Sequence, residues 1–200
     1  MNRGRLIVLE GGEASGKSTQ ARLLAADLGA VLTHEPGATA AGRRIREVVL
    51  DPAAGALGAR AEALLMAADR AQHVLEVIGP ALGRGDDVVS DRFTPSSLAY
   101  QGYGRGLDLD ELRRLSAWAA AGLEPDLVVL LDVPPALARQ RRGGRPDRME
   151  AEDEAFHERV AAGYRQLAAA DPDRWVVVDG TGDIDDVART VRDAVGLLIQ

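Results

Sequence analysis

The stretch "LEGGEASGKSTQ", residues 9–20, fits the pattern G-x-x-x-x-G-K-[ST] through Gly11, Gly16, Lys17 and Ser18. The apolar run that leads into it predicts a buried strand, and the residues after it predict a helix. In this order, the glycines let backbone N–H groups turn toward a phosphate chain, and the helix N-terminus adds partial positive charge. We therefore predict a nucleotide site in which Lys17 reaches the β- and γ-phosphates and Ser18 holds Mg²⁺. The residues predicted to bind the nucleotide are Gly11, Gly12, Glu13, Ala14, Ser15, Gly16, Lys17, Ser18 and Thr19.

Lys17 is the only lysine in a chain whose lysines and arginines number 24 together. Arginine supplies the positive charge everywhere else. A compact ammonium on a thin stem fits where the planar guanidinium of arginine would collide with backbone. The isolation of Lys17 therefore supports a specific role inside the loop.

The composition is that of an ordinary globular protein. The chain has 200 residues, of which 46% are hydrophobic and 28% charged, and this length suits one domain, residues 1–200. No cysteine is present, so disulfides and thiolate metal sites are excluded. The net charge of −7 argues against a nucleic-acid partner, and the first apolar run is too short for a signal peptide or a membrane span. We expect a cytoplasmic protein with small phosphorylated ligands.

Short apolar runs alternate with amphipathic stretches along the chain. The runs are continuous in Val, Ile and Leu, as in strands covered on both faces. We predict an α/β fold with a five-stranded parallel sheet flanked by helices. The predicted strands lie within residues 5–10, 30–35, 86–92, 126–133 and 174–180. The predicted helices lie within residues 18–28, 38–50, 57–82, 109–121, 151–170 and 183–198.

Polar residues follow these runs at the strand ends, where ligands bind in parallel sheets. Asp91 and Arg92 follow the third run, and Asp132 ends the fourth. A carboxylate facing the phosphate loop organises Mg²⁺ directly or through water, so both aspartates are candidates. Asp132 could instead cap or orient the helix after Pro134 and Pro135.

Further motifs occur in a fixed order: "HEPGAT", "DRAQ", "DRF", "SSLAYQG" and "GRGL". With the phosphate loop, this order resembles the thymidylate kinase family, bacterial type, over nearly the whole chain. The resemblance implies a P-loop kinase that transfers the γ-phosphoryl group of ATP to dTMP with Mg²⁺, and a homodimer packed through long helices. The apolar stretch of residues 57–82 is a plausible dimer contact. The family resemblance favours Asp91 over Asp132 as the metal residue, because Asp91 is joined to Arg92.

The resemblance also assigns residues to the acceptor nucleotide. Arg46 and Arg92 match residues that hold its phosphate, and Arg70 matches the arginine that reaches the thymine ring. Glu13 matches an acidic residue that contacts the 3′-hydroxyl, and Tyr100 matches the tyrosine that leaves no room for a 2′-hydroxyl.

Two polar positions and one apolar position complete this set. Ser97 and Gln101 match residues that face the base. Met66 stands where the family commonly has a phenylalanine that stacks on thymine, and a thioether presents no flat face. Two further departures are His34 and Ala38, because the family usually reads R-E-P-G-G-T where this chain has "HEPGAT".

The segment "RQRRGGRPDRME", residues 139–150, carries five arginines interrupted by glycines and a proline. A charge run is often only a solvated face. This one resembles the lid that closes over ATP, and the phosphate loop has no arginine of its own. We expect the lid to supply a catalytic arginine, with Arg142 and Arg145 as candidates beside Lys17 and Arg92.

Two alternatives remain at this point. One is a kinase for another nucleoside monophosphate. The other is a P-loop ATPase switch, although such a switch would not need Arg92 and Tyr100 as an acceptor site. A GTPase with an N-K-x-D motif is excluded, because the only asparagine is Asn2.

Overall fold

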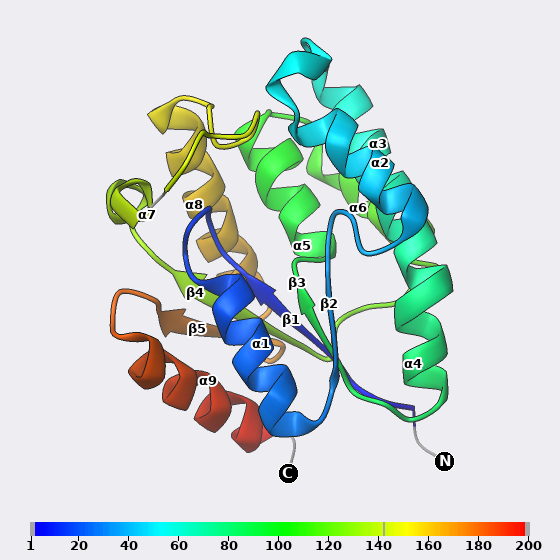
Figure 1. The fold of residues 1–200 in the computed structure, drawn as a ribbon, viewed down its shortest axis with the longest axis vertical. Coiled ribbons are helices and arrows are strands. Elements are labelled where there is room, and N and C mark those ends of the chain that lie inside the picture. Colours follow the sequence, from blue (N-terminus) through cyan, green and yellow to red (C-terminus); the bar gives the residue numbers. More distant parts are fainter. Residues whose placement is uncertain (1–2, 142, 199–200) are drawn as a thin grey trace.

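A five-stranded parallel sheet forms the centre of the molecule (Figure 1), in the order β2-β3-β1-β4-β5. The computed structural model describes residues 3–141 and 143–198. The strands are β1 (Leu6–Glu10), β2 (Val31–His34), β3 (Val88–Asp91), β4 (Leu127–Asp132) and β5 (Trp175–Asp179). Each lies within a run predicted from the sequence, so the predicted α/β sheet is confirmed.

Helices alternate with the strands, mostly where the amphipathic pattern predicts them. The predicted helices are α1 (Lys17–Leu28), α2 (Ala40–Leu50), α3 (Ala59–His73) with its extensions η2 (Val74–Ile78) and α4 (Gly79–Gly83), α6 (Leu109–Ala119), α8 (Glu154–Ala170) and α9 (Ile184–Leu198). Four more are α7 (Pro135–Arg141), the 3₁₀ turn η1 (Pro52–Ala54), α5 (Thr94–Ser97) and its π-helical continuation η3 (Leu98–Gly104). The α5–η3 helix was not predicted, because glycines and wide π-helical turns interrupt the 3.6-residue period.

The two faces of the sheet carry separate hydrophobic clusters, as alternation along β1 requires. Ile7 and Leu9 pack with residues of α1 and α9 on one face. Leu6 and Val8 point to the opposite face, where Phe93 and Ile78 cover them. On that face, α8 packs against η3 beside β4. The carboxyl ends of β1 and β3 therefore open between α1 on one side and η3 with α8 on the other.

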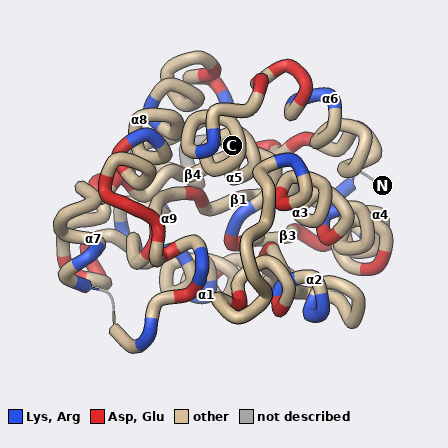
Figure 2. Tube along the Cα trace, turned by 90° about the horizontal axis from the view of Figure 1, so that it is seen from above, with Lys and Arg blue, Asp and Glu red and all other residues tan. Residues whose placement is uncertain are grey.

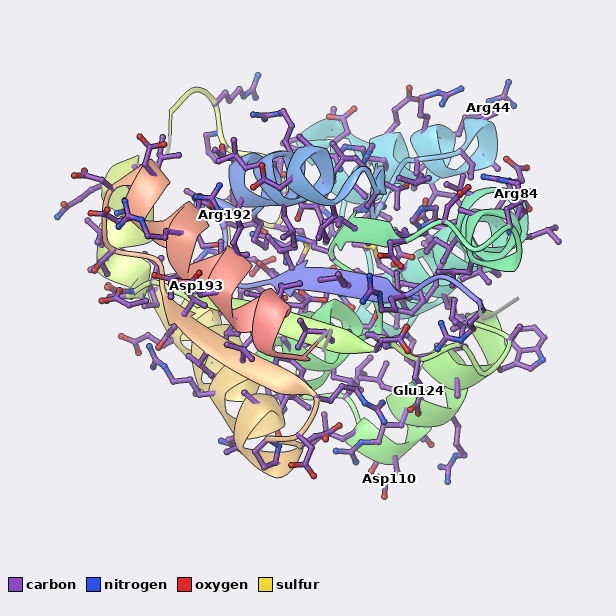
Figure 3. The ribbon with its side chains drawn as sticks, turned by 90° about the horizontal axis from the view of Figure 1, so that it is seen from below. Arg44, Arg84, Asp110, Glu124, Arg192 and Asp193 are labelled. Carbon is purple, nitrogen blue, oxygen red and sulfur yellow. The ribbon has the colours of Figure 1, made fainter. Side chains whose placement is uncertain are left out.

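Positively and negatively charged residues are interspersed along the Cα trace in Figure 2. Arg44, Arg84 and Asp110 project outward at the periphery in Figure 3. Within the described part of the chain, no helix is both long and apolar enough to cross a membrane.

Candidate active site

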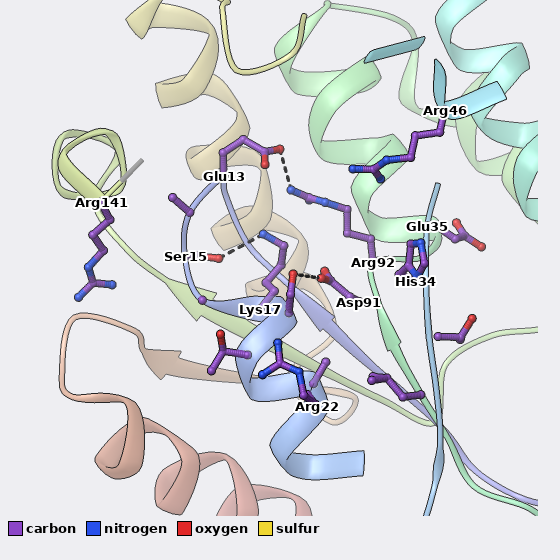
Figure 4. Close-up of a pocket in the computed structure, with 17 residues that line it drawn as sticks. Glu13, Ser15, Lys17, Arg22, His34, Glu35, Arg46, Asp91, Arg92 and Arg141 are labelled. Carbon is purple, nitrogen blue, oxygen red and sulfur yellow. Dashed lines mark hydrogen bonds and ion pairs between the residues drawn. The ribbon is translucent and has the colours of Figure 1, made fainter. Parts of the chain in front are cut away.

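Backbone geometry shapes the phosphate loop between β1 and α1 (Figure 4). Gly16, just before the helix, has φ +94°, which favours glycine. Gly11 has φ +144°, and a Cβ there would lie 2.6 Å from Leu131 O. The Lys17 ammonium donates to Gly12 O at 2.6 Å and to Ser15 Oγ at 3.3 Å. The loop is thus curled around its lysine.

Lys17 is buried, with only 5% of the residue exposed. Burial and the neighbouring Arg92 charge lower the pKa of Lys17 to about 8, although the Glu13 carboxylate opposes them. Because a phosphate chain would add negative charge around the ammonium, nucleotide binding favours its charged form. The surroundings of the Lys17 ammonium therefore favour binding of an anionic ligand such as a phosphate chain.

Ser18 and Asp91 supply two oxygen donors at the mouth of the loop. Ser18 Oγ donates to Asp91 Oδ2 at 2.5 Å. Hydroxyl and carboxylate oxygens suit Mg²⁺, which commonly binds one or two carboxylates together with substrate phosphates and water. Over the described residues, no group of three or more acidic or histidine side chains is placed to hold a metal by itself. The residues present fit an ion shared with a nucleotide.

Asp132, the rival candidate, is engaged elsewhere. Arg165 on α8 donates to both Asp132 carboxylate oxygens, at 2.9 Å each. The suggestion that Asp132 caps or orients α7 is therefore corrected, because its carboxylate binds α8. The geometry favours Asp91 as the carboxylate beside the loop.

A cavity of about 730 Å³, here called the loop cavity, opens over the phosphate loop (Figure 4). It contains every predicted nucleotide-binding residue except Gly11 and Gly12, whose carbonyls accept hydrogen bonds from Arg92 and Lys17. It is lined by Glu13, Ala14, Ser15, Gly16, Lys17, Ser18, Thr19, Ala21, Arg22, Leu32, Thr33, His34, Glu35, Arg46, Asp91, Arg92 and Arg141.

A second cavity, here called the inner cavity, adjoins the loop cavity between α2, α3 and η3. It is lined by Glu13, Glu35, Pro36, Arg46, Leu50, Met66, Arg70, Arg92, Ser96, Ser97, Tyr100, Gln101, Asp147 and Met149. All eight residues predicted to bind the acceptor substrate are among them. The structure thus brings together side chains from the phosphate loop, α2, α3 and η3.

Arg92 joins the two cavities and lies in a constrained backbone position. Its φ of +75° is unusual for a residue with a Cβ, and such strain concentrates at functional sites. Its guanidinium donates to Glu13 Oε1 at 2.7 Å and to Tyr100 Oη at 3.1 Å. Tyr100 Oη in turn donates to Glu13 at 2.7 Å. Arg92, Glu13 and Tyr100 therefore form one network at the boundary between the cavities.

Arg70 is held by hydrogen bonds that could not be predicted from the sequence. Its Nε donates to Glu35 Oε2 at 3.0 Å, and its terminal nitrogens donate to Ser97 Oγ at 3.1 Å and to Phe93 O at 3.0 Å. His73 Nδ1 lies 3.0 Å from the other Glu35 oxygen. Glu35 thus couples the turn after β2 to α3.

Glu10 was also missed as a site residue. It is fully buried at the end of β1 and accepts hydrogen bonds from Phe93 N, from the N–H and hydroxyl of Ser96, and from Tyr164 Oη. Burial raises the pKa of Glu10, against the Arg92 charge and these hydrogen bonds. A glutamate closing an otherwise apolar strand was the available signal.

The arginine-rich segment divides into parts with different surroundings. Arg139 pairs with Glu154 at 2.8 Å, and Arg141 donates to Gly180 O and Thr181 O while lining the loop cavity. Arg145 is exposed and lines neither cavity. Arg148 donates to Glu62 on α3 and to Val49 O, so this end of the predicted lid is anchored. Arg142 lies outside the described residues.

The three departures from the family pattern have distinct positions. His34 lines the loop cavity, where burial and the Arg46 charge lower its pKa. Ala38 lies between Gly37 and Thr39, whose side chain caps α2. Met66 lines the inner cavity with Arg70, as expected from their four-residue spacing on α3.

Together, these observations define a protein of the P-loop NTPase fold class with two adjoining cavities. The family model described as thymidylate kinase matches residues 9–191. The thymidylate kinase of Leifsonia xyli is 51% identical over 94% of this chain and 93% of its own length, and that of Deinococcus radiodurans is 50% identical over 98% of both. The chain belongs to the thymidylate kinase family.

A solved structure agrees with this assignment. The crystal structure of thymidylate kinase from Ehrlichia chaffeensis superposes with a TM-score of 0.82 at 30% identity, covering 97% of this chain and 99% of that one.

Proposed function

We propose that this enzyme transfers the γ-phosphoryl group of ATP to dTMP, giving ADP and dTDP. The observation that carries the proposal is that the loop cavity and the inner cavity share Glu13, Glu35, Arg46 and Arg92. An ATP on the phosphate loop and a monophosphate in the inner cavity would meet at this shared wall. Membership of the thymidylate kinase family supports dTMP as the acceptor.

In this assignment, the residues act mainly by positioning and by charge, as phosphoryl transfer requires. Lys17 and the loop N–H groups bind the β- and γ-phosphates of ATP. Arg46 and Arg92 hold the acceptor phosphate, so that its oxygen approaches the γ-phosphorus in line. Arg92 and a lid arginine, Arg142 or Arg145, neutralise charge that develops on the moving group. The contacts of Arg92 with Glu13 and Tyr100 fix its donors before reaction, which limits reorganisation.

Ser18 and Asp91 would hold Mg²⁺, which supplies charge neutralisation to the phosphate oxygens when bound. The Ser18–Asp91 hydrogen bond keeps both oxygens at one place on the loop. Glu13 and Tyr100 contact the deoxyribose, and Arg70, Ser97, Gln101 and Met66 surround the base.

The same proposal extends to the organisation of the enzyme. The chain, residues 1–200, is one nucleoside monophosphate kinase domain with a lid at about residues 139–150. It forms a homodimer, supported by the exposed Leu64 and Leu75 in the long helical stretch and by Trp118 on α6, exposed at 59%, 70% and 82%. Sedimentation of the purified protein tests this assembly.

We propose a cytoplasmic location for the enzyme, because its proposed substrates are nucleotides dissolved in the cytoplasm.

A coupled assay that detects ADP tests the activity directly. Purified protein with Mg-ATP is offered dTMP, dUMP, dCMP, dGMP and dAMP in turn, and dTMP should give the highest kcat/KM. A preference for another monophosphate would identify a different kinase. ATP hydrolysis that proceeds equally without any acceptor would instead identify an ATPase switch.

A further inference from the structure

Glu62 is a fully buried carboxylate that connects the inner cavity to the lid segment. It lies on α3, four residues before Met66 and eight before Arg70, and has no exposed surface. Its Oε1 accepts from Gln101 Nε2 at 2.9 Å and, at the longer distance of 3.3 Å, from Arg105 Nε. Its Oε2 accepts from Arg105 at 3.0 Å and from Arg148 at 2.6 Å. Each carboxylate oxygen therefore has a defined partner.

The charge state of Glu62 determines whether its carboxyl group can donate a hydrogen bond or only accept one. Burial alone would raise its pKa, but the hydrogen bonds from Arg105, Gln101 and Arg148 outweigh burial, so the pKa of Glu62 lies below its usual range. An ionised carboxylate only accepts hydrogen bonds. Any amide that contacts it must present its NH₂ group.

That requirement fixes the orientation of the Gln101 amide. With Nε2 directed to Glu62, Oε1 takes the opposite side of the amide group. Gln101 lines the inner cavity, and its Oε1 has no hydrogen-bond partner within residues 3–141 and 143–198. A cavity-lining carbonyl that accepts no hydrogen bond from the described residues favours a ligand that donates one.

Arg70 provides the complementary group in the same cavity. The Arg70 Nε–H donates to Glu35, both terminal nitrogens donate to Ser97 Oγ, and Nη2 also donates to Phe93 O. One Nη1–H of the guanidinium is therefore left without a partner in the described part of the chain. The inner cavity thus offers a donor from Arg70 and an acceptor from Gln101. Thymine and uracil match this pair through O4 and N3–H, whereas cytosine presents the reverse pattern, an N4 donor and a bare N3.

We propose that Glu62 is a positioning residue that orients the Gln101 amide and thereby makes the inner cavity reject cytosine nucleotides. This inference rests on the proposed function, because it concerns the base of the acceptor monophosphate. Rejection arises because a cytosine ring would face acceptor against acceptor at Gln101 and donor against donor at Arg70.

The variant Glu62→Gln reverses the hydrogen-bonding polarity. Its carbonyl oxygen should take the Oε2 position, where Arg148 donates at 2.6 Å and the Arg105 terminal nitrogen at 3.0 Å, because the Oε1 position receives only the longer 3.3 Å contact from Arg105 Nε. Its NH₂ group then faces Gln101, which must turn its own carbonyl inward and present NH₂ to the cavity. The kcat/KM ratio of dTMP to dCMP should fall by about tenfold or more. The ratio of dTMP to dUMP should not change, since these bases share O4 and N3–H.

A matched control separates this effect from general loosening of the cluster. Arg148→Lys perturbs Glu62 but leaves the Glu62–Gln101 hydrogen bond in place, so it should lower thermal stability without lowering the dTMP to dCMP ratio. Equal loss of the ratio in both variants would overturn the proposal, as would an unchanged ratio in Glu62→Gln.

A second variant covers the case in which Glu62→Gln does not fold. Gln101→Met removes the acceptor without altering the buried carboxylate, and it should also lower the dTMP to dCMP ratio by about tenfold. An unchanged ratio there would show that Gln101 does not select the base. A native protein that does not phosphorylate dTMP would refute the proposed function, whereas a native dTMP kinase with an unaltered ratio in the variants would refute only the role of Glu62.

Discussion

The Ser18 hydroxyl and the Asp91 carboxylate lie 2.5 Å apart, although 73 residues separate them in the sequence. The contact exists because β1 and β3 are adjacent and parallel, so the loop after one meets the last residue of the other. Both oxygens suit Mg²⁺. This arrangement distinguishes Asp91 from Asp132, which binds Arg165.

Asp91→Asn should therefore impair activity far more than Asp132→Asn. Loss of the charge at the metal position should lower kcat/KM for Mg-ATP by about a hundredfold, consistent with the role of such carboxylates in phosphoryl transfer. The partly exposed Asp132–Arg165 pair should contribute less than about 1 kcal/mol to stability, and because Asp132 lines neither cavity its loss should hardly change activity. Steady-state kinetics over a range of Mg²⁺ concentrations measures both. Equal losses would show that the metal is held elsewhere.

The lone lysine should be irreplaceable. Lys17→Met should abolish phosphoryl transfer. Lys17→Arg should lower the rate of transfer nearly as much, because the planar guanidinium cannot enter the curled loop. Single-turnover assays measure both, with circular dichroism to establish that each variant is folded. Near-normal turnover by Lys17→Arg would contradict this explanation.

The lowered pKa of Lys17 also makes the free energy of unfolding depend on pH. Because the folded-state pKa, about 8, lies below the unfolded value, the unfolded chain binds more protons between about pH 8 and pH 10.5. The Lys17 contribution to the free energy of unfolding is therefore unfavourable below pH 8 and improves as the pH rises through that window. Lys17→Met should stabilise the ligand-free protein by about 1–2 kcal/mol near pH 7, with the gain shrinking toward pH 10. Urea unfolding at both pH values measures it.

The lid should act through Arg145, which is exposed and forms no ion pair with the other described residues, together with Arg142. Arg145→Ala, or the double change with Arg142→Ala, should lower kcat by about tenfold or more while changing dTMP binding little, because a closing cation acts mainly in the transition state. Arg139→Ala is the matched control, since Arg139 already pairs with Glu154 at the surface. Should the double variant retain its kcat, the segment is only a solvated face.

Asp69 should lower the stability of the folded protein at neutral pH. Its Oδ1 accepts from Gly37 N at 2.9 Å, but its buried Oδ2 has no partner among the described residues. Burial and the Glu35 charge raise the pKa of Asp69 to about 6. The folded state therefore binds more protons between about pH 4 and pH 6, and stability falls as the pH rises through that window.

Asp69→Asn should remove this penalty while keeping an acceptor for Gly37. The free energy of unfolding should rise by about 1–2 kcal/mol at pH 7 and hardly change at pH 4. Urea unfolding at the two pH values measures the difference. Asp86→Asn, at an exposed pair with Arg84, serves as the control. A gain of equal size at both pH values would contradict the assignment.

Local patterns predicted the sheet and the phosphate loop, because apolar runs and glycine spacing are properties of neighbouring residues. The contacts that fix Arg70 and Gln101 were not predictable in this way. Glu35 and Glu62 reach them across 35 and 39 residues, and only the packing of α3 against the turn and η3 creates those pairs. The ion pair between Arg148 and Glu62 could not be predicted for the same reason, because the residues around Arg148 in the sequence show only a basic run.

Met66 is the departure from the family pattern that most directly concerns the substrate. It lines the inner cavity with Arg70, whose guanidinium is held rigidly by Glu35 and Ser97. A sulfur near a ring edge contributes about 0.3–1.5 kcal/mol, comparable with the roughly 0.5–1.5 kcal/mol of an aromatic pair, so dTMP binding need not be lost. A flexible thioether nevertheless defines the slot for the 5-methyl group less sharply than a flat ring.

We therefore expect dTMP to be preferred while dUMP and 5-substituted analogues are tolerated. Met66→Phe should raise the dTMP to dUMP ratio of kcat/KM by a few-fold, because the energy difference stays under about 1 kcal/mol. Met66→Leu controls for side-chain volume without adding a ring, and it should leave the ratio unchanged. Steady-state kinetics with both acceptors measures the effect. If Phe and Leu shift the ratio equally, packing rather than stacking governs the slot, and an unchanged ratio in Met66→Phe would show that Met66 does not touch the base.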